Sequence, residues 1–359
     1  MFDKYDKFVI SQEFYNGYPL LSKTDISGSK PALYFSVSNR SAGKTTFFNG
    51  MLLHNFLKKR KKFLLLYRYK YQFQAAADGF FKNIGVLYFQ GLNMSQEAGV
   101  KGVFDRLYIS DGEKKVECGY ATALPAANSL KTYSHLLSDV DVILMDEVFP
   151  ENDKYLKNEI DLFMSIHDSI ARGVNQMSRY VQCIMVGNLI NIFNPYFDAL
   201  GVVDSMQLSS HFVRGDGFVI EQSFNEASAQ KHKENAFHRA FKDAAYTAAS
   251  EEMRYINTNY DMIDQSVCDR GRYMFTIRYA GTAYSVRYNY EGCFYYVSNT
   301  PDPQFRLQHA ATEADITEDA IYNPLSSFRK LLKENYRRNC VKFKNLKCKA
   351  AALHFISGS

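Results

Sequence analysis

The sequence predicts an α/β protein in two parts: a larger part with a central, mostly parallel sheet, and a smaller α+β part that follows a helical linker. In the first half, short apolar runs alternate with helical stretches, which is typical of a parallel sheet. Residues 218–270 contain neither Gly nor Pro, whereas after Gly271 the apolar residues recur with period two. We therefore expect domains at residues 1–215 and 266–359 and a linker at residues 216–265.

Five apolar runs supply the strands expected in the first domain. They are residues 32–37 (ALYFSV), 63–69 (FLLLYRY), 120–124 (YATAL), 142–146 (VILMD) and 181–186 (VQCIMV). The intervening residues 44–62 have a helical pattern and end in the cations KKRKK, which complement the dipole at the end of a helix. The basic run therefore has two equally good explanations, stabilisation of the helix end and DNA binding.

The change of periodicity predicts the linker and the second domain. Apolar residues recur at helical spacing within the linker, at Phe237, Phe241, Ala244, Ala245, Ala248 and Met253. Three period-two runs follow, RYMFTIRYAG, TAYSVRYNYEG and CFYYVSNT. They predict a three-stranded meander with Gly-containing turns at 280–281 and 291–292.

Length and composition exclude several classes of protein. A chain of 359 residues that is 46% hydrophobic and 23% charged can bury the cores of two domains, which excludes wholesale disorder. No run of about 18 apolar residues occurs, so no membrane span is expected. The N-terminus carries Asp3 and Asp6 and no apolar core of a secretory signal, which favours the cytoplasm. The six cysteines form no CxxC pair and indicate free thiols rather than a zinc site.

Positive charge is concentrated at the C-terminal end. The net charge is +5, but residues 324–359 hold nine cations against Glu334 alone, a net of 9 − 1 = +8, which leaves 5 − 8 = −3 for the rest. A basic tail of this kind indicates either a polyanionic partner or a solvated helix face, and charge alone does not choose between them.

The segment SNRSAGKT fits the phosphate-binding loop GxxxxGK[ST], except that Ser38 replaces the first Gly. An apolar strand precedes it and a helix follows it, so backbone N–H groups can form an anion cradle. We expect Lys44 to contact the β- and γ-phosphates of ATP and to assist catalysis, and Thr45 to bind Mg²⁺. The positive φ that this loop needs is harder for Ser than for Gly, which leaves the role of Ser38 open. The residues expected at the nucleotide are Ser38, Asn39, Arg40, Ser41, Ala42, Gly43, Lys44, Thr45 and Thr46.

Two later strands end in polar residues that complete the expected site. The run VILMDE ends in Asp146, expected to hold Mg²⁺, and Glu147, expected to orient and deprotonate the attacking water. The run VQCIMV is followed by Asn188, which is either a sensor of the γ-phosphate or an ordinary turn residue or helix cap. Phosphate loop and acidic strand, in this order, favour ATP hydrolysis.

The segments SNRSAGKT, VILMDEV and VGNLINIFNPYF together resemble the DNA packaging ATPases of phi29-like podoviruses, motors of the terminase large subunit type. Arg40 within the loop, the YRYK run at 67–70 and the NPYF run at 194–197 strengthen this resemblance. It implies a P-loop ATPase that forms a homomeric ring, expected to be a pentamer, and pumps double-stranded DNA through the portal of a procapsid. It also implies work in the host cytoplasm, transiently on the procapsid, where a structural RNA is a further possible partner.

Such rings complete each site with a cation from the neighbouring subunit. The resemblance places this arginine finger between the acidic strand and the strand before Asn188, where Arg172 fits best and Arg179 is the alternative. Lys131 is a further candidate that acts on the neighbour. The resemblance also implies an RNase H-like C-terminal domain that has lost nuclease activity, since residues 273–280 (YMFTIRYA) contain no carboxylate for a metal cage.

Two other functions stay open from the residues alone. One is a cellular P-loop ATPase stimulated by DNA, such as a helicase loader or a partition motor. The other is a scaffold that binds nucleotide without hydrolysing it, which the unusual Ser38 permits. DNA-stimulated turnover of ATP separates the motors from the scaffold.

Overall fold

A computed structural model describes residues 8, 15–39, 42–150, 154–172, 178–188, 194–202, 211–223, 262–267 and 271–357. Contacts within the chain define two compact units, one containing the described residues up to 223 and one containing those from 262 onward. Among the described residues, no helix combines the length and the apolar character needed to cross a membrane. The cysteines in this part of the chain carry free thiols, and Cys268 lies outside it.

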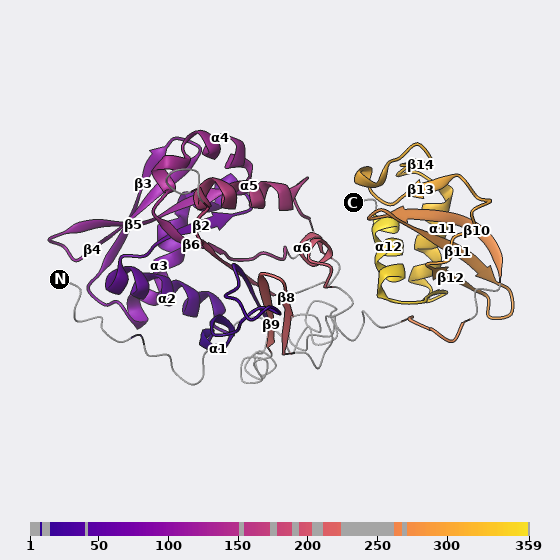
Figure 1. Cartoon of the computed structure of the whole chain (residues 1–359), viewed down its shortest axis with the longest axis horizontal. Helices are drawn as coiled ribbons and strands as arrows, with labels where there is room; N and C mark the ends of the chain where they lie inside the picture. The colour runs from indigo at the N-terminus through magenta and orange to yellow at the C-terminus, as the bar shows by residue number, and fades with distance from the viewer. Residues whose placement is uncertain are drawn as a thin grey trace, which may run out of the picture. The chain divides into compact units, whose positions relative to one another are not determined.

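The first unit is built on a nine-stranded sheet in the order β3-β4-β5-β2-β6-β7-β1-β9-β8 (Figure 1). Its strands are β1 (Leu33–Ser38), β2 (Lys62–Tyr67), β3 (Asn93–Val100), β4 (Phe104–Ser110), β5 (Lys115–Ala123), β6 (Val140–Met145), β7 (Gln182–Gly187), β8 (Phe212–Gly215) and β9 (Phe218–Ser223). Neighbours from β5 to β9 in this order are parallel, and antiparallel pairs close both edges. The carboxyl ends of six strands therefore meet at one edge, where ligands of such sheets bind.

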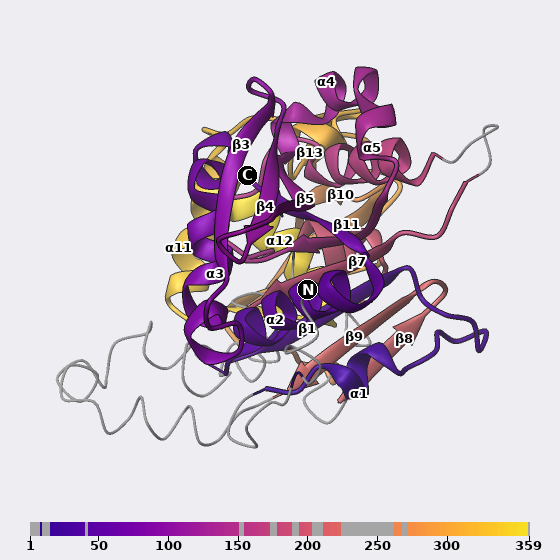
Figure 2. The same cartoon turned by 90° about the vertical axis from the view of Figure 1, so that its left-hand side faces the viewer.

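Helices pack in two groups against this sheet, α2 with α3 and α4 with α5 (Figures 1 and 2). The helices of this unit are α1 (Tyr18–Leu21), α2 (Lys44–Lys59), α3 (Ala76–Leu87), α4 (Ala127–Thr132), α5 (Glu159–Ala171) and α6 (Pro195–Ala199), with 3₁₀ turns η2 (Lys70–Ala75), η3 (Leu124–Ala126) and η4 (Ser134–Leu137). Side chains alternate along β1 accordingly. Tyr34 lies in the core with the residues of α2, while Phe35 contacts the ring of Phe197 in α6.

The five predicted strands are confirmed as β1, β2, β5, β6 and β7, and β5 begins earlier than expected. The expected start of the helical linker at residue 216 is wrong, because residues 218–223 form β9 between β1 and β8. The absence of Gly and Pro in this region permits a strand as well as a helix, and five consecutive buried residues favour the sheet. The rest of the predicted linker, up to residue 261, lies outside the described residues.

The second unit is a mixed sheet in the order β14-β13-β10-β11-β12-β15, with two helices packed on it. Its elements are β10 (Arg272–Tyr279), β11 (Thr282–Asn289), β12 (Phe294–Ser298), β13 (Gln308–Ala310), η7 (Glu313–Asp315), β14 (Ala320–Ile321), α11 (Ser327–Arg337), β15 (Val341–Phe343) and α12 (Leu346–Ser357). The predicted meander is confirmed as β10, β11 and β12. Ala280 and Gly281 both have positive φ, 46° and 75°, as a tight hairpin turn requires.

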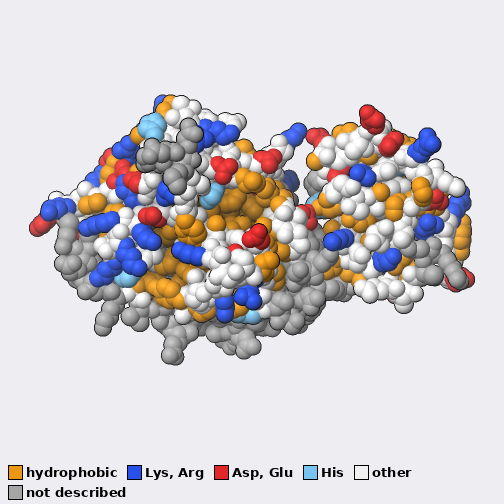
Figure 3. All heavy atoms as spheres, viewed as in Figure 1, with side chains coloured by type: hydrophobic (Ala, Val, Ile, Leu, Met, Phe, Trp, Pro, Cys, Tyr) orange, Lys and Arg blue, Asp and Glu red, His pale blue; other side chains and the backbone are white. Residues whose placement is uncertain are grey.

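The C-terminal cations do not form a free basic tail, because the segment folds into α11, β15 and α12. Arg329 is 4% exposed and donates to the carbonyls of Ala310, Ala311 and Phe355, and Lys342 pairs with Asp264 at 2.8 Å. On the face seen in Figure 3, Lys and Arg side chains of this unit are interspersed with Asp and Glu. Several cations nonetheless remain exposed, namely Lys330, Lys333, Arg337, Arg338 and Lys347.

Candidate functional site

The predicted phosphate loop joins the carboxyl end of β1 to the start of α2. Gly43 has φ of +92°, which a residue with a side chain rarely adopts, and it caps the 16-residue helix that begins at Lys44. The first N–H groups of a helix have no partner within it and carry partial positive charge, so this end attracts anions. Arg40 and Ser41 lie outside the described residues.

Lys44 is 6% exposed, and its ammonium group is surrounded by oxygen atoms. Nζ donates to Ser38 Oγ at 2.6 Å and to Asn188 Oδ1 at 2.8 Å, and it reaches the carbonyls of Asn39 and Ser38 at 3.1 and 3.3 Å. An ammonium has three donors for these four acceptors, so phosphate oxygens can replace some of them without leaving the charge bare. The structure thus brings Ser38, Lys44 and Asn188 together, as the sequence predicts.

Ser38 does not need the positive φ that made it a concern in the sequence. It is the last residue of β1 and pairs with Ser223 of β9, so its backbone is extended. Its hydroxyl accepts the shortest of the hydrogen bonds from Lys44. The departure from the usual Gly is therefore compatible with an intact loop.

Asp146 follows β6 and contacts the first turn of α2 directly. Thr45 Oγ1 donates to Asp146 Oδ2 at 2.7 Å, and the backbone N–H of Glu147 donates to Asp146 Oδ1 at 2.9 Å. Burial raises the pKa of Asp146, and the hydrogen bonds from Thr45 and Glu147 and the charge of Lys44 offset this only in part. Hydroxyl and carboxylate oxygens are ligands that Mg²⁺ prefers, so this donor set fits the ion.

Glu147 has φ of +54°, which places it in the left-handed region directly after the strand. Its side chain is exposed, in contrast to that of its neighbour Asp146. The two adjacent acids therefore have different surroundings, since Asp146 is hydrogen-bonded to Thr45 and Glu147 faces solvent.

A buried arginine that the sequence did not identify as a site residue holds the backbone at this strand end. Arg68, just after β2, donates to the carbonyl of Glu147 at 3.0 Å and to that of Val148 at 2.6 Å. The same guanidinium forms an ion pair with Glu159 at 2.9 Å, and Tyr196 Oη donates to Glu159 at 2.8 Å. The YRYK and NPYF runs drew attention to Arg68 and Tyr196 as marks of a resemblance, but no sequence signal marked Glu159.

Two asparagines that follow β7, Asn188 and Asn194, have different positions. Asn188 contacts Lys44, whereas Asn194 caps α6 by accepting from the N–H of Phe197 at 3.0 Å. The helix-cap alternative that the sequence left open for Asn188 thus applies instead to Asn194.

The predicted cations Arg172, Arg179 and Lys131 lie outside this cluster. Arg179 donates to the carbonyl of Val140, the first residue of β6, and to that of Ile170 at 3.2 Å. Arg172 directly follows α5 and is exposed, and Lys131 is exposed near the end of α4. Since Val140 and Asp146 lie at opposite ends of β6, Arg172 and Arg179 lie at the edge of the sheet away from Lys44.

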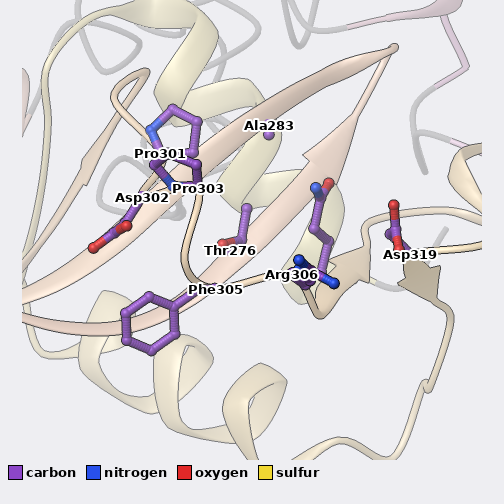
Figure 4. Close-up of a pocket in the computed structure, with 9 residues that line it drawn as sticks. Thr276, Ala283, Pro301, Asp302, Pro303, Phe305, Arg306 and Asp319 are labelled. Atoms are coloured by element: carbon purple, nitrogen blue, oxygen red, sulfur yellow. The ribbon is translucent and has the colours of Figure 1, made fainter.

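The second unit contains an open hollow of about 470 Å³ (Figure 4). It is lined by Thr276, Ala283, Pro301, Asp302, Pro303, Phe305, Arg306, Gln308 and Asp319. Figure 4 shows Asp302 and Asp319 apart, with Arg306 between them. Within the described residues, no group of three or more His, Cys, Asp and Glu side chains is arranged to hold a metal ion.

Comparison with known proteins adds a family to this geometry. The family model described as podovirus DNA encapsidation protein (Gp16) matches residues 10–357. The DNA packaging protein of Bacillus phage B103 is 25% identical over 317 residues, which cover 87% of this chain and 90% of that protein. The DNA packaging protein of Bacillus phage PZA is 25% identical over 310 residues, 86% of this chain and 85% of that one. A chain in the viral genome packaging motor assembly of bacteriophage Phi-29 has the same fold, with a TM-score of 0.65 at 23% identity over 96% of this chain and 99% of that one.

Proposed function

Because the chain belongs to the podovirus Gp16 DNA encapsidation family, we propose that it is a motor subunit that uses ATP to move double-stranded DNA through a portal into a procapsid. The observation that carries the proposal is the meeting of three segments at one edge of the sheet. Lys44 and Thr45 of α2 contact Asn188 after β7 and Asp146 after β6, across 144 and 101 residues of sequence. ATP hydrolysis requires a cation that binds the phosphates, oxygen ligands for Mg²⁺ and a polar side chain near the γ-phosphate, and these segments can supply all three.

Each residue has a task that follows from its position. The triphosphate would lie at the start of α2, with Lys44 exchanging its present oxygen partners for phosphate oxygens. Thr45 and Asp146 would hold Mg²⁺, which neutralises charge on the phosphates when it is bound. Glu147, exposed beside them, would orient the attacking water and accept its proton. Asn188 would exchange its contact with Lys44 for a hydrogen bond to the γ-phosphate. Release of the γ-phosphate after hydrolysis would then change the contacts of Asn188.

A second copy of the chain would complete the site. We assign the finger to Arg172, because it is exposed and lies across the sheet from its own Lys44, so that it can act only on a neighbour. Arg179 fits this task less well, since it already donates to two backbone carbonyls of its own subunit. Lys131 stays a further candidate. These assignments imply a closed ring, and we propose a pentamer in the host cytoplasm that docks on the portal.

The second unit would bind nucleic acid without cleaving it. Strand β10 carries no carboxylate, whereas hydrolysis by two metal ions needs a cage of acids. Exposed cations of α11, among them Lys330, Lys333 and Arg337, could contact the phosphates of DNA or of a procapsid RNA.

The test incubates the protein with its procapsid, duplex DNA and ATP, and measures how much DNA becomes resistant to nuclease. Glu147→Gln should bind ATP yet protect no DNA and hydrolyse no ATP, while Glu113→Gln, in an exposed turn, should match the wild type. ATP binding without DNA-stimulated hydrolysis in the wild type would favour the scaffold instead. Stimulated hydrolysis without DNA protection would favour a cellular motor.

A further inference from the structure

A buried cluster beneath the phosphate loop takes no part in the mechanism above. It consists of Tyr15, Ser36 of β1, Glu221 of β9 and the edge of His211. Tyr15 Oη donates to Glu221 Oε2, and Ser36 Oγ donates to Tyr15 Oη at 2.8 Å. The residues Tyr15, Ser36 and Glu221 are 8%, 0% and 3% exposed. A carboxylate so far inside a protein is costly unless its partners are fixed, so this arrangement calls for an explanation.

Tyr15 contacts the phosphate loop at one point and helix α2 at two. Its backbone N–H donates to the carbonyl of Ala42 at 2.9 Å. Its ring packs against Phe47 and Phe48 near the start of α2, with centroids 5.7 and 5.8 Å away. The residue therefore spans the end of the loop and the start of the helix that follows it.

The contact with Ala42 has a direct consequence for the loop. Because a peptide is planar and trans, the carbonyl of Ala42 and the N–H of Gly43 point in opposite directions. Holding the carbonyl toward Tyr15 turns the N–H of Gly43 away from it, so this donor has one fixed direction in the cradle. Loop N–H groups bind phosphate only when they converge on it.

The hydroxyl of Tyr15 is anchored on the other side by the sheet. Glu221 lies opposite Ser36 in the β1–β9 pairing, so both partners of the hydroxyl come from one rigid ladder. His211 Nε2 lies 3.6 Å from the second carboxylate oxygen of Glu221. The cluster thus ties the phosphate loop to β9, a strand outside the three segments that meet at Lys44.

We propose that Tyr15 is a positioning residue that fixes the Ala42–Gly43 peptide for phosphate binding, and that Glu221 anchors Tyr15 from β9. This inference rests on the proposed nucleotide site. It assigns a task in nucleotide affinity to a residue that contacts neither metal nor the expected reacting atoms. Since Asp146 and Glu147 follow β6, which does not pair with β9, loss of the anchor should change KM for ATP and leave kcat nearly constant.

The test measures thermal unfolding, the Kd of a fluorescent ATP analogue, and KM and kcat in the full chain. Tyr15→Phe keeps the ring and removes the hydroxyl, and we expect Kd and KM to rise about tenfold, the effect of losing one charge-assisted hydrogen bond. Tyr18→Phe is the matched control, because Tyr18 packs on the same Phe47 but is 45% exposed, and it should bind as the wild type does.

Variants of the anchor separate positioning from stability. Glu221→Gln retains an oxygen that accepts from Tyr15 and should keep near-normal affinity, whereas Glu221→Ala should match Tyr15→Phe. The double variant Tyr15→Phe with Glu221→Ala should be no worse than either single one, since both remove the same link. If Tyr15→Phe does not fold, Glu221→Asp, which withdraws the carboxylate by one carbon, carries the same test and should raise KM.

Two results would overturn the inference: wild-type affinity in folded Tyr15→Phe, or equal losses in Glu221→Gln and Glu221→Ala. The inference alone fails if the wild type binds ATP, Lys44→Ala does not, and Tyr15→Phe still does. If the wild type itself binds no ATP, the proposed function fails, and this outcome is recognised before any variant is compared.

Discussion

Arg68 and Glu159 form an ion pair inside the first unit, with side chains that are 4% and 0% exposed. The guanidinium places Nε and Nη2 on the carboxylate at distances from 2.9 to 3.2 Å, and its remaining N–H groups bind the carbonyls of Glu147 and Val148. Arginine suits this place because its planar fork satisfies several acceptors at once, which an ammonium cannot do. The backbone at Glu147 is therefore held by an arginine that directly follows the neighbouring strand β2.

Replacing Arg68 should damage both stability and turnover. Arg68→Ala leaves Glu159 buried without its counter-charge, which typically costs about 3–5 kcal/mol. It also removes the hydrogen bonds from Arg68 to the carbonyls of Glu147 and Val148. We expect a lower free energy of unfolding in urea and loss of ATP hydrolysis. Arg106→Ala is the control, because its ion pair with Glu117 is longer, at 3.4 Å, and the arginine is 38% exposed. It should cost about 0–1 kcal/mol.

A double variant separates the two effects. Arg68→Met combined with Glu159→Gln removes both charges and keeps an acceptor for Tyr196, so most of the stability should return. Hydrolysis should stay low, because no donor reaches the carbonyl of Glu147. Normal turnover in this double variant would show that the contact between Arg68 and the Glu147 backbone has no part in catalysis.

Asp146→Asn should stabilise the nucleotide-free protein while it abolishes hydrolysis. Burial raises the pKa of Asp146, so the folded state takes up the proton more readily than the unfolded chain. Stability then falls as pH rises through that pKa, and the ionised form at neutral pH is the less stable one. Asn avoids this cost, and its amide can accept from the N–H of Glu147 while it donates to Thr45.

Thermal unfolding across pH checks this prediction. The variant should unfold at a higher temperature than the wild type at neutral pH, and the difference should shrink as pH falls, because the wild-type carboxyl becomes neutral too. Asp141→Asn, on β6 itself, is the control and should show no such gain. A variant less stable than the wild type at neutral pH would mean that the hydrogen bonds of Asp146 outweigh its burial.

Local patterns predicted the parts of the site that lie near one another in sequence or at strand ends. Lys44 and Thr45 follow from the loop pattern, and Asp146 and Asn188 follow from apolar runs that end in polar residues. Parallel strands bring such ends to one edge, so their meeting is a consequence of the fold class. The predicted helix was wrong at residues 218–223. These residues form a strand because they pair with β1 and β8, which local spacing does not reveal.

Partners far apart in sequence could not be predicted in this way. Arg68 and Glu159 are 91 residues apart, and Tyr15 and Glu221 are 206 residues apart. Neither Glu159 nor Glu221 belongs to a sequence motif. Each is recognised as important only from the buried donor that it contacts in the folded protein. Buried charge pairs of this kind carry no periodicity, whereas core residues do.

Ser38→Gly tests whether the loop is strained at the position where the sequence departs from the usual pattern. Because Ser38 is extended and pairs with Ser223, Gly offers no relief there and should cost about 0.5–1 kcal/mol in backbone entropy. Ser38→Ala separates the hydroxyl from the backbone, since it removes only the hydrogen bond from Lys44 and the one that Ser38 Oγ donates to the carbonyl of Asn39. Chemical unfolding of the nucleotide-free protein measures both, and a gain in stability for Gly would mean that this position does need positive φ.

Arg172→Ala and Arg179→Ala should fail for different reasons. Arg172 is exposed after α5, so its loss should leave the unfolding temperature unchanged and reduce turnover by about 10³-fold or more, as expected for an arginine finger. Arg179 donates to the carbonyls of Val140 and Ile170, and its loss removes the donor that these two groups share. Arg179→Ala should therefore cost about 1–3 kcal/mol in the free energy of unfolding.

Mixing subunits decides whether Arg172 acts on a neighbour. Helix α5 rises about 20 Å between the Glu159 end, which faces the site, and the Arg172 end, so one chain cannot bring Arg172 to its own Lys44. A ring that mixes Arg172→Ala with Glu147→Gln subunits contains interfaces where an intact Arg172 meets an intact Glu147, and it should recover part of the hydrolysis that neither variant shows alone. Lys131→Ala mixed in the same way tests the other exposed candidate. No recovery in any mixture would mean that each ATP site is completed within one chain. Neither Arg172 nor Lys131 would then couple hydrolysis in neighbouring subunits.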